Sequence, residues 1–207
     1  MTLVTIIYTF MTGAFSQLLL YNYSSSINYK YEKKFQLFAL IVTGFFYNCL
    51  WMTYGFSADF LILALSTTIL INIALIDSFY LEIPDEHNLM ILFLGISSVI
   101  IKSTNPTDAI LGALVGGGLF LLMAILSRGG MGGGDIKLVA STGTILGLTK
   151  TLLCTYYSFM FAAVGILYAI YEAFKKKKKH KKLILAKEIP FGPYIVTSVL
   201  MIFLDLA

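Results

Sequence analysis

Charged side chains are scarce in this sequence. Asp, Glu, Lys and Arg make up only 13% of its 207 residues, whereas 58% are hydrophobic and the mean hydropathy is +0.84. This composition excludes an ordinary soluble domain. The longest polar stretches, residues 23–34 and 175–188, are each too short to bury a core of their own. We therefore expect one integral-membrane domain over residues 1–207, without a separate soluble domain.

The sequence also has few cysteines and lacks the features of a secretory signal peptide. The only two cysteines, Cys49 and Cys154, lie inside apolar runs and form no C-x-x-C pair, so the pattern indicates packing residues and no zinc site. No basic residue precedes the first apolar stretch, and no small-residue cleavage site follows it. That stretch is expected to be a retained membrane span and not a secretory signal.

Long apolar runs are what the sequence has in abundance. A spanning helix needs about 20 mainly apolar residues, and continuous runs favour helices over the alternating strands of a membrane barrel. The sequence thus predicts an all-α, polytopic transmembrane helical bundle with about eight membrane segments, of which 88–102 and 138–148 are short. The expected segments are 2–22, 35–56, 59–80, 88–102, 107–126, 138–148, 150–173 and 191–206.

The basic residues predict the orientation of this bundle, because loops rich in Lys and Arg tend to stay in the cytoplasm. With eight spans, 13 of the 15 basic residues fall on one side, and only Lys102 and Lys150 fall on the other. The 13 are Lys30, Lys33, Lys34, Arg128, Lys137, Lys175 to Lys179, Lys181, Lys182 and Lys187. The glycine-rich loop around residue 130 is therefore expected on the cytoplasmic side, and both termini on the other.

A first polar stretch on that side, ALIDSFYLEIPDEHN, covers residues 74–88. If a helix begins near Asp59, a rise of 1.5 Å per residue puts Asp77 roughly 27 Å along it, near the edge of a core about 30 Å thick. Pro84 restricts Ile83 and should end the helix before an acidic turn. Asp77 is expected close to water yet within the helix.

Two further stretches lie on the same side. RGGMGGGDIKL, residues 128–138, places Asp135 at the start of the next apolar segment, where helix amides favour a carboxylate. Its glycines leave the backbone free to take positive φ and to approach another element closely. EIPFGPYI, residues 188–195, is a rigid entry into the last span, because Pro190 and Pro193 lack amide protons.

Two carboxylates near one membrane face suggest a functional site, because ionisable groups in a bundle are costly. Carboxylates a few Å apart share a proton, so one can activate water while the other, protonated, polarises a carbonyl. Asp77 and Asp135 are therefore candidate catalytic residues for aspartic protease chemistry, which requires no metal and no cofactor.

These motifs resemble those of the type IV prepilin peptidases, membrane aspartic proteases that remove leader peptides from pilins. The G-x-G-D motif followed by x-K matches Gly132, Gly134, Asp135 and Lys137, and the aspartate before I-P-[DN]-x-x-N matches Asp77 with Pro84, Asp85 and Asn88. P-F-G-P matches Pro190, Phe191, Gly192 and Pro193. The first span also resembles the family's signature there, with Ala14 and Gln17 as departures.

The resemblance implies an endopeptidase of the bacterial inner membrane, with its active site at the cytoplasmic face and prepilins or pilin-like proteins as substrates. Lys137 would bias the charge of the dyad or orient its loop. Many bacterial members carry a cysteine-containing insert between the first two spans and also N-methylate their product. Residues 23–34 contain no cysteine, so methylation is not expected.

Other charged stretches have simpler interpretations. The run from Lys175 to Lys182 is expected to set topology and contact anionic lipid, at about 1 kcal/mol per residue near a charged leaflet. Glu82, Asp85 and Glu86 are better placed to receive a basic leader. We expect no nucleic-acid partner.

Two alternatives remain open. A metal enzyme could use Asp77, Asp85 and His87 as ligands. A small transporter or channel could instead pair Asp77 and Asp135 with Arg128 and Lys137 along a polar pathway, although such a pathway should carry charges through to the far face.

Overall fold

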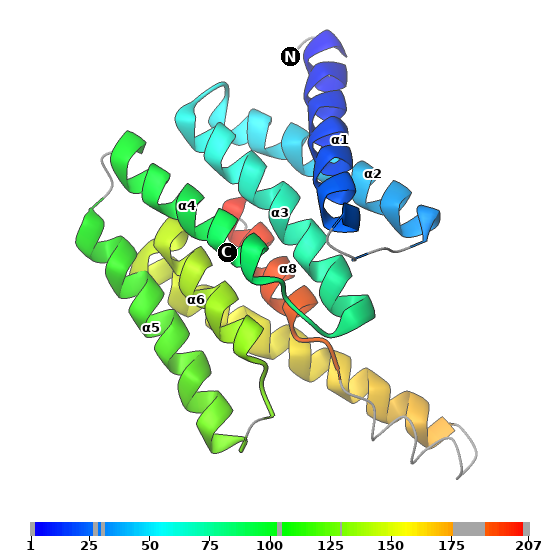
Figure 1. Ribbon diagram of the computed structural model, residues 1–207, viewed down its shortest axis with the longest axis vertical. Coiled ribbons are helices and arrows are strands. Elements are labelled where there is room, and N and C mark those ends of the chain that lie inside the picture. The colour runs from blue at the N-terminus through cyan, green and yellow to red at the C-terminus, as the bar shows by residue number, and fades with distance from the viewer. Residues whose placement is uncertain are drawn as a thin grey trace.

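A computed structural model of the chain describes residues 3–26, 29, 32–102, 105–128, 130–175 and 189–204. Within these residues the regular secondary structure consists of seven α-helices and no strand, which confirms the all-helical prediction (Figure 1). The helices are α1 (Leu3–Ser26), α2 (Lys33–Tyr54), α3 (Ala58–Tyr80), α4 (Asp85–Lys102), α5 (Pro106–Leu126), α6 (Gly133–Lys175) and α8 (Gly192–Phe203).

Helix α3 lies at the centre of the bundle. Buried residues make up 72% of its most apolar stretch, against 22–28% in the other three long apolar helices, and it contacts α1, α2, α4 and α8. The helix begins after Ser57, whose side chain accepts a hydrogen bond from Phe60 N at 3.2 Å. It ends at Leu81, which has a left-handed φ of 57° and whose amide donates to Asp77 O.

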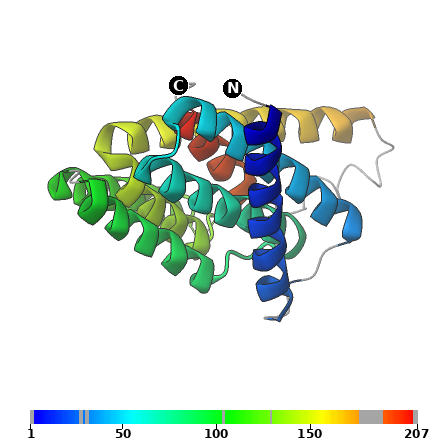
Figure 2. The same cartoon turned by 90° about the horizontal axis from the view of Figure 1, so that it is seen from above.

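Helix α6 differs from its predicted form. The expected segments 138–148 and 150–173 form one element, interrupted only at Gly147, where φ is 74° and ψ is 179°. A φ of this sign favours glycine. Asp108 of α5 accepts a hydrogen bond from Leu148 N at 3.1 Å and so caps the second half of α6. Beyond this break the helix turns back across the molecule (Figures 1 and 2).

Eight membrane segments are not confirmed. Four of the described helices are long and apolar enough to cross a membrane: Lys33–Tyr54, Ala58–Tyr80, Pro106–Leu126 and Gly133–Glu172. Helix α4 begins with two acidic residues, Asp85 and Glu86, and the apolar helix α8 has only 12 residues. The structure is therefore that of a multi-pass membrane protein, with fewer unambiguous spans than the sequence predicted.

Three connections meet at one end of the bundle. The end of α3, the start of α6 and the start of α8 lie together in the lower half of Figure 1, although they are distant in the sequence. Helix α8 packs against both α3 and α6, which brings the residues before Gly192 between them. This junction contains both candidate catalytic aspartates, Asp77 and Asp135.

Candidate functional site

A cavity of about 370 Å³ lies at this junction. Both candidate aspartates line it, together with the glycine-rich loop and the residues that lead into α8. The lining residues are Asp77, Leu81, Gly130, Met131, Gly132, Asp135, Ile189, Pro190 and Phe191. The structure therefore brings the three polar stretches together around one cavity, which we call the dyad cavity.

Asp77 is held by the first turn of α8. Its side chain is in the last turn of α3 and only 5% exposed, and its Oδ2 accepts a hydrogen bond from Gly192 N at 2.8 Å. A Cβ at position 192 would lie 2.7 Å from that oxygen. Gly192 is thus the donor, and it is a glycine because the carboxylate occupies the space of a side chain. Sequence reasoning placed Gly192 in a motif but gave it no such role.

Asp135 lies in the first turn of α6 and is 7% exposed. Its backbone N donates to Gly132 O at 3.2 Å, so the loop folds back on the helix start. Its Oδ1 is buried and has no hydrogen-bond partner among the described residues. A buried, unsatisfied carboxylate oxygen is costly in a purely structural role, and it leaves an acceptor available beside the cavity.

Of the glycines before Asp135, Gly134 is needed for close packing. None of the described glycines from 130 to 134 has a positive φ; among the described glycines only Gly55 and Gly147 do. The expectation of positive φ is therefore wrong for these positions, and Gly129 lies outside the described residues. A Cβ at Gly134, however, would lie 2.9 Å from Ile83 Cβ, whereas one at Gly133 would meet nothing within 4 Å. Gly134 lets the start of α6 approach the chain that follows Asp77.

The remaining motif residues form a second group at the start of α4. Lys137 Nζ makes two contacts with the Asp85 carboxylate, at 2.7 and 2.8 Å, and both side chains are more than half exposed. Pro84 and Asn88 are buried, and none of these four residues lines the dyad cavity. Lys137 thus ties α6 to α4 and does not contact the two aspartates in this structure.

A second, more apolar cavity of about 540 Å³ adjoins the first. The two cavities share four lining residues: Gly130, Met131, Ile189 and Phe191. The second cavity continues between α5, α6 and α8 toward Phe159 and Tyr194. Sequence reasoning missed Met131, Ile189 and Tyr194, because apolar residues in an apolar chain carry no signal that separates cavity walls from packing.

The structure does not assemble the alternative metal site. Among the described residues, no three His, Cys, Asp or Glu side chains form a group that could hold an ion. His87 is fully buried in the first turn of α4, outside the four candidate spans, and its Nε2 lies 3.1 Å from Ser24 Oγ. Burial lowers the pKa of His87 to about 4. It belongs to a buried polar contact between α1 and α4.

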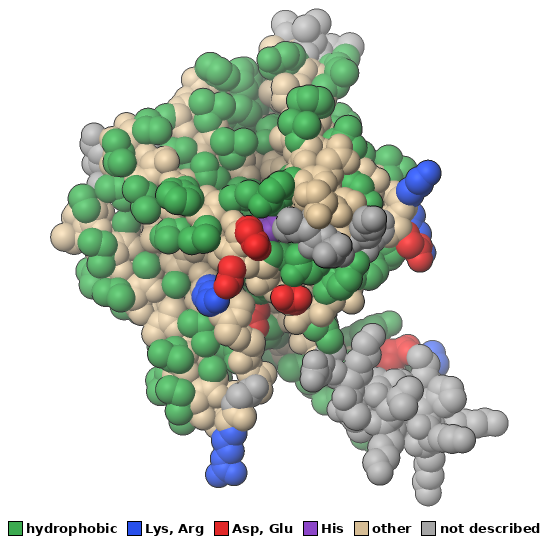
Figure 3. Space-filling view, in the orientation of Figure 1, with side chains coloured by type: hydrophobic (Ala, Val, Ile, Leu, Met, Phe, Trp, Pro, Cys, Tyr) green, Lys and Arg blue, Asp and Glu red, His purple; other side chains and the backbone are tan. Residues whose placement is uncertain are grey.

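Acidic side chains gather on the face around the start of α4 (Figure 3). Glu82, Asp85 and Glu86 are all exposed there. Burial and the neighbouring Glu82 raise the pKa of Tyr29, which lies beside this group. In the basic run, Lys175 ends α6 and is exposed, and residues 176–182 lie outside the described residues.

Comparison with known proteins adds independent information. A family model described as "Type IV leader peptidase family" matches residues 64–169, a range that contains both aspartates. A "Prepilin leader peptidase/N-methyltransferase" of Bacillus subtilis (strain 168) is 26% identical over 167 residues, which cover 80% of this chain and 64% of that protein. A protein of the same description from Neisseria gonorrhoeae is 29% identical over 194 residues, covering 91% of this chain and 63% of its own length.

The chain thus spans less than two thirds of the length of these two curated relatives. No solved structure matches it.

Proposed function

Because the chain belongs to the type IV leader peptidase family, we propose that it is a membrane-embedded aspartic endopeptidase with Asp77 and Asp135 as its catalytic dyad. Its proposed substrates are type IV prepilins or pilin-like proteins, from which it removes the leader peptide. The observation that carries this proposal is the single cavity that both buried aspartates line. Hydrolysis is chemistry that two carboxylates and a water molecule can perform without a metal or cofactor.

In the proposed mechanism the two carboxylates share one proton. The ionised carboxylate takes a proton from a water molecule, and the resulting hydroxide attacks the carbonyl carbon of the scissile bond. The protonated partner donates to the carbonyl oxygen and polarises it. Collapse of the tetrahedral intermediate then breaks the C–N bond, and the leaving amine receives a proton from the dyad. Because the carboxylates titrate as a pair, the proton belongs to the dyad as a whole.

Other residues position this dyad. The Gly192 N–H fixes one oxygen of Asp77, and the close approach of Gly134 to Ile83 fixes the start of α6, which carries Asp135. Gly132 lies beside the Asp135 side chain, since a Cβ there would be 3.2 Å from its Oδ2. We assign these glycines positioning roles, because preorganised carboxylates need no further rearrangement when the substrate binds.

The adjoining apolar cavity supports the choice of substrate. A peptide whose scissile bond lies at the dyad must place its neighbouring residues in the adjoining space, and Phe159, Phe191 and Ile166 make one such side apolar. A leader that precedes a hydrophobic segment fits this arrangement, with the hydrophobic side in the larger cavity. The exposed Glu82 and Glu86 near the start of α4 suit a basic leader.

We further propose that the enzyme resides in the bacterial inner membrane with its dyad at the cytoplasmic face, as the lysine asymmetry suggests. Anionic lipid near Lys175 to Lys182 is proposed on the same ground. We do not propose N-methylation, although the names of the two relatives include it. The short, cysteine-free connection over residues 23–34 is the reason.

The decisive experiment incubates the purified protein in detergent with a prepilin-like substrate and a methyl donor, and measures product masses. Wild type should release the leader without adding a methyl group. Asp77→Asn and Asp135→Asn should each abolish cleavage, because an amide keeps the shape but cannot transfer the proton. Asp108→Asn is the matched control, since its amide oxygen can still accept from Leu148 N. Substantial turnover by either dyad variant would refute the assignment of the dyad, whereas failure of wild type to cleave would favour a transporter.

A further inference from the structure

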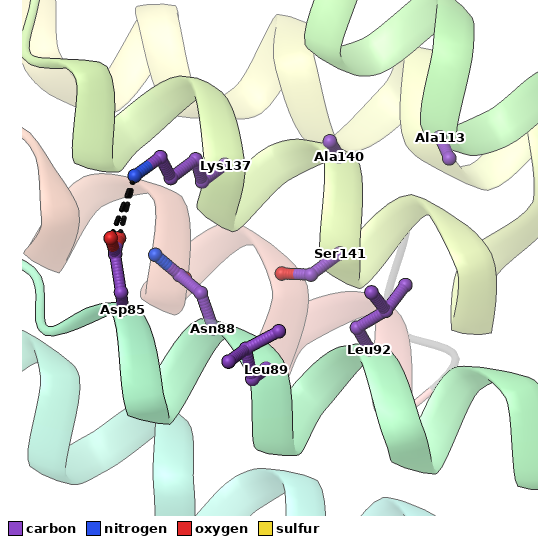
Figure 4. Close-up of a pocket in the computed structure, with 8 residues that line it drawn as sticks. All are labelled: Asp85, Asn88, Leu89, Leu92, Ala113, Lys137, Ala140 and Ser141. Atoms are coloured by element: carbon purple, nitrogen blue, oxygen red, sulfur yellow. Dashed lines mark hydrogen bonds and ion pairs between the residues drawn. The ribbon is translucent and has the colours of Figure 1, made fainter.

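A separate pocket of about 380 Å³ lies between α4, α5 and α6. Figure 4 shows the Asp85–Lys137 ion pair between α4 and α6, with Asn88 and Ser141 directed into the space between the same two helices. Leu89 and Leu92 of α4 contribute apolar walls. None of its lining residues lines the dyad cavity, so it is a distinct feature of the fold.

Asn88 is the unusual member of this pocket. Its side chain is only 5% exposed, yet both Nδ2 and Oδ1 are buried without a hydrogen-bond partner among the described residues. Figure 4 shows the amide directed into the space between α4 and α6. Buried amides are nearly always satisfied in folded proteins, so a donor and an acceptor without a protein partner at a pocket wall point to a ligand that can satisfy both.

The chemistry of the walls restricts what that ligand can be. Asp85 and Lys137 are paired at 2.7 Å and so neutralise each other, which leaves no net charge to attract a free anion or cation. A carboxamide presents one donor and one acceptor side by side, the complement of a peptide group's C=O and N–H. The acyl chain of a lipid offers neither.

The position of the pocket relates it to the dyad. Lys137 follows Asp135 by two residues in α6, which puts the two side chains on roughly opposite sides of a helix with 3.6 residues per turn. The pocket and the dyad cavity therefore flank the start of α6, about one helix diameter or roughly 10 Å apart. An extended peptide covers that distance in about three residues.

We propose that this pocket is a substrate-binding subsite. Asn88 hydrogen-bonds one peptide group of the leader about three to five residues before the scissile bond, at 3.2–3.4 Å per extended residue, and an apolar leader side chain packs on Leu89 and Leu92. The choice of the leader for this pocket rests on the proposed function, in which the apolar cavity beside the dyad binds the hydrophobic segment that follows the scissile bond.

The test compares KM values for a full-length substrate and for one whose leader is cut two residues before the scissile bond. Asn88→Leu removes the donor and acceptor, and Leu92→Trp fills the pocket. Each variant should raise KM for the full-length substrate about tenfold, as for the loss of one well-made hydrogen bond. For the truncated substrate, the KM of each variant should be close to that of wild type. Asn88→Asp keeps an acceptor, so its KM for the full-length substrate should lie between those of wild type and Asn88→Leu. Ile100→Trp, on an exposed part of the same helix, is the matched control.

A second readout does not depend on turnover. In a variant with Asp77→Asn, Cys49→Ser and Cys154→Ser, a cysteine introduced by Ser141→Cys should form a disulfide, on addition of a mild oxidant, with a single cysteine placed three to five residues before the scissile bond. A cysteine on the other side of that bond should not react.

Two results would overturn the proposed subsite, provided that wild type cleaves the substrate. One is an unchanged KM in both Asn88→Leu and Leu92→Trp, and the other is the absence of the crosslink at Ser141→Cys. A phospholipid that co-purifies with wild type and is lost in Leu92→Trp without a change in KM would overturn it in favour of lipid. Failure of wild type to cleave any prepilin-like substrate would instead refute the proposed function.

Discussion

Two adjacent glycines at the start of α6 should respond oppositely to the same substitution. A Cβ added at Gly134 would lie 2.9 Å from Ile83 Cβ, whereas one added at Gly133 would meet nothing within 4 Å. Neither residue has a positive φ, so alanine is compatible with the backbone at both positions. Any difference between the two variants must therefore come from the contact with Ile83.

The geometry sets the size of the effect. Carbon atoms pack best at about 3.5–4.0 Å, so Gly134→Ala must push the start of α6 away from Ile83 by roughly 0.6–1.1 Å. Asp135 is the next residue and moves with it. A displacement of about 1 Å at a catalytic group costs on the order of 10²-fold in rate, and overpacking of this kind costs about 1–3 kcal/mol of stability. Gly133→Ala should instead stabilise the helix by about 0.4–1 kcal/mol.

The assay measures the initial rate of leader removal and the thermal midpoint of each purified variant in the same detergent. Gly134→Ala should lose most of its activity even at temperatures where it remains folded, and Gly133→Ala should cleave at the wild-type rate with an equal or higher midpoint. Near-normal cleavage by Gly134→Ala, or an equal loss in both variants, would refute the view that close approach to Ile83 positions Asp135.

Three further outcomes are expected. Gly192→Ala should reduce cleavage by about 10- to 100-fold, because the new Cβ displaces the Asp77 carboxylate from a charge-assisted hydrogen bond; Gly118→Ala, which meets no neighbour within 4 Å, should not. Prolonged chelation should leave cleavage intact, and a loss that zinc restores would contradict the assignment of water activation to carboxylates. Stability should fall as the pH drops from about 6.5 to about 4, because the unfolded chain protonates His87 in that window and the folded chain does not; a pH dependence unchanged in His87→Gln would exclude this cause.

Prediction of the fold from sequence was successful where the signal was continuous. Long apolar runs require helices in a membrane, because only a helix satisfies its own backbone hydrogen bonds there. The extent of α3 and α5 followed closely, with predicted segments of 59–80 and 107–126 against Ala58–Tyr80 and Pro106–Leu126. The predicted number of membrane segments was not confirmed. Hydropathy cannot distinguish a sharp break within a helix, such as the one at Gly147, from the end of that helix.

The polar residues of the candidate site were also visible in the sequence, because Asp77 and Asp135 are unusual in an apolar chain and lie in recognisable motifs. Their roles within the site were less visible. Lys137 was expected to bias the charge of the dyad or to orient its loop, and the structure pairs it with Asp85. A lysine side chain reaches whichever carboxylate the packing of its helix brings near it, and the sequence of one helix does not contain that information.

The sequence by itself determined the class of protein and the identity of its ionisable residues, because both depend on composition and local spacing. Tertiary structure alone decided which backbone amide holds Asp77, why position 134 has no side chain, and that Asn88 opens into a pocket of its own. Each of these depends on segments that are far apart in the chain. Such contacts follow from how whole helix surfaces pack, and no local pattern specifies them.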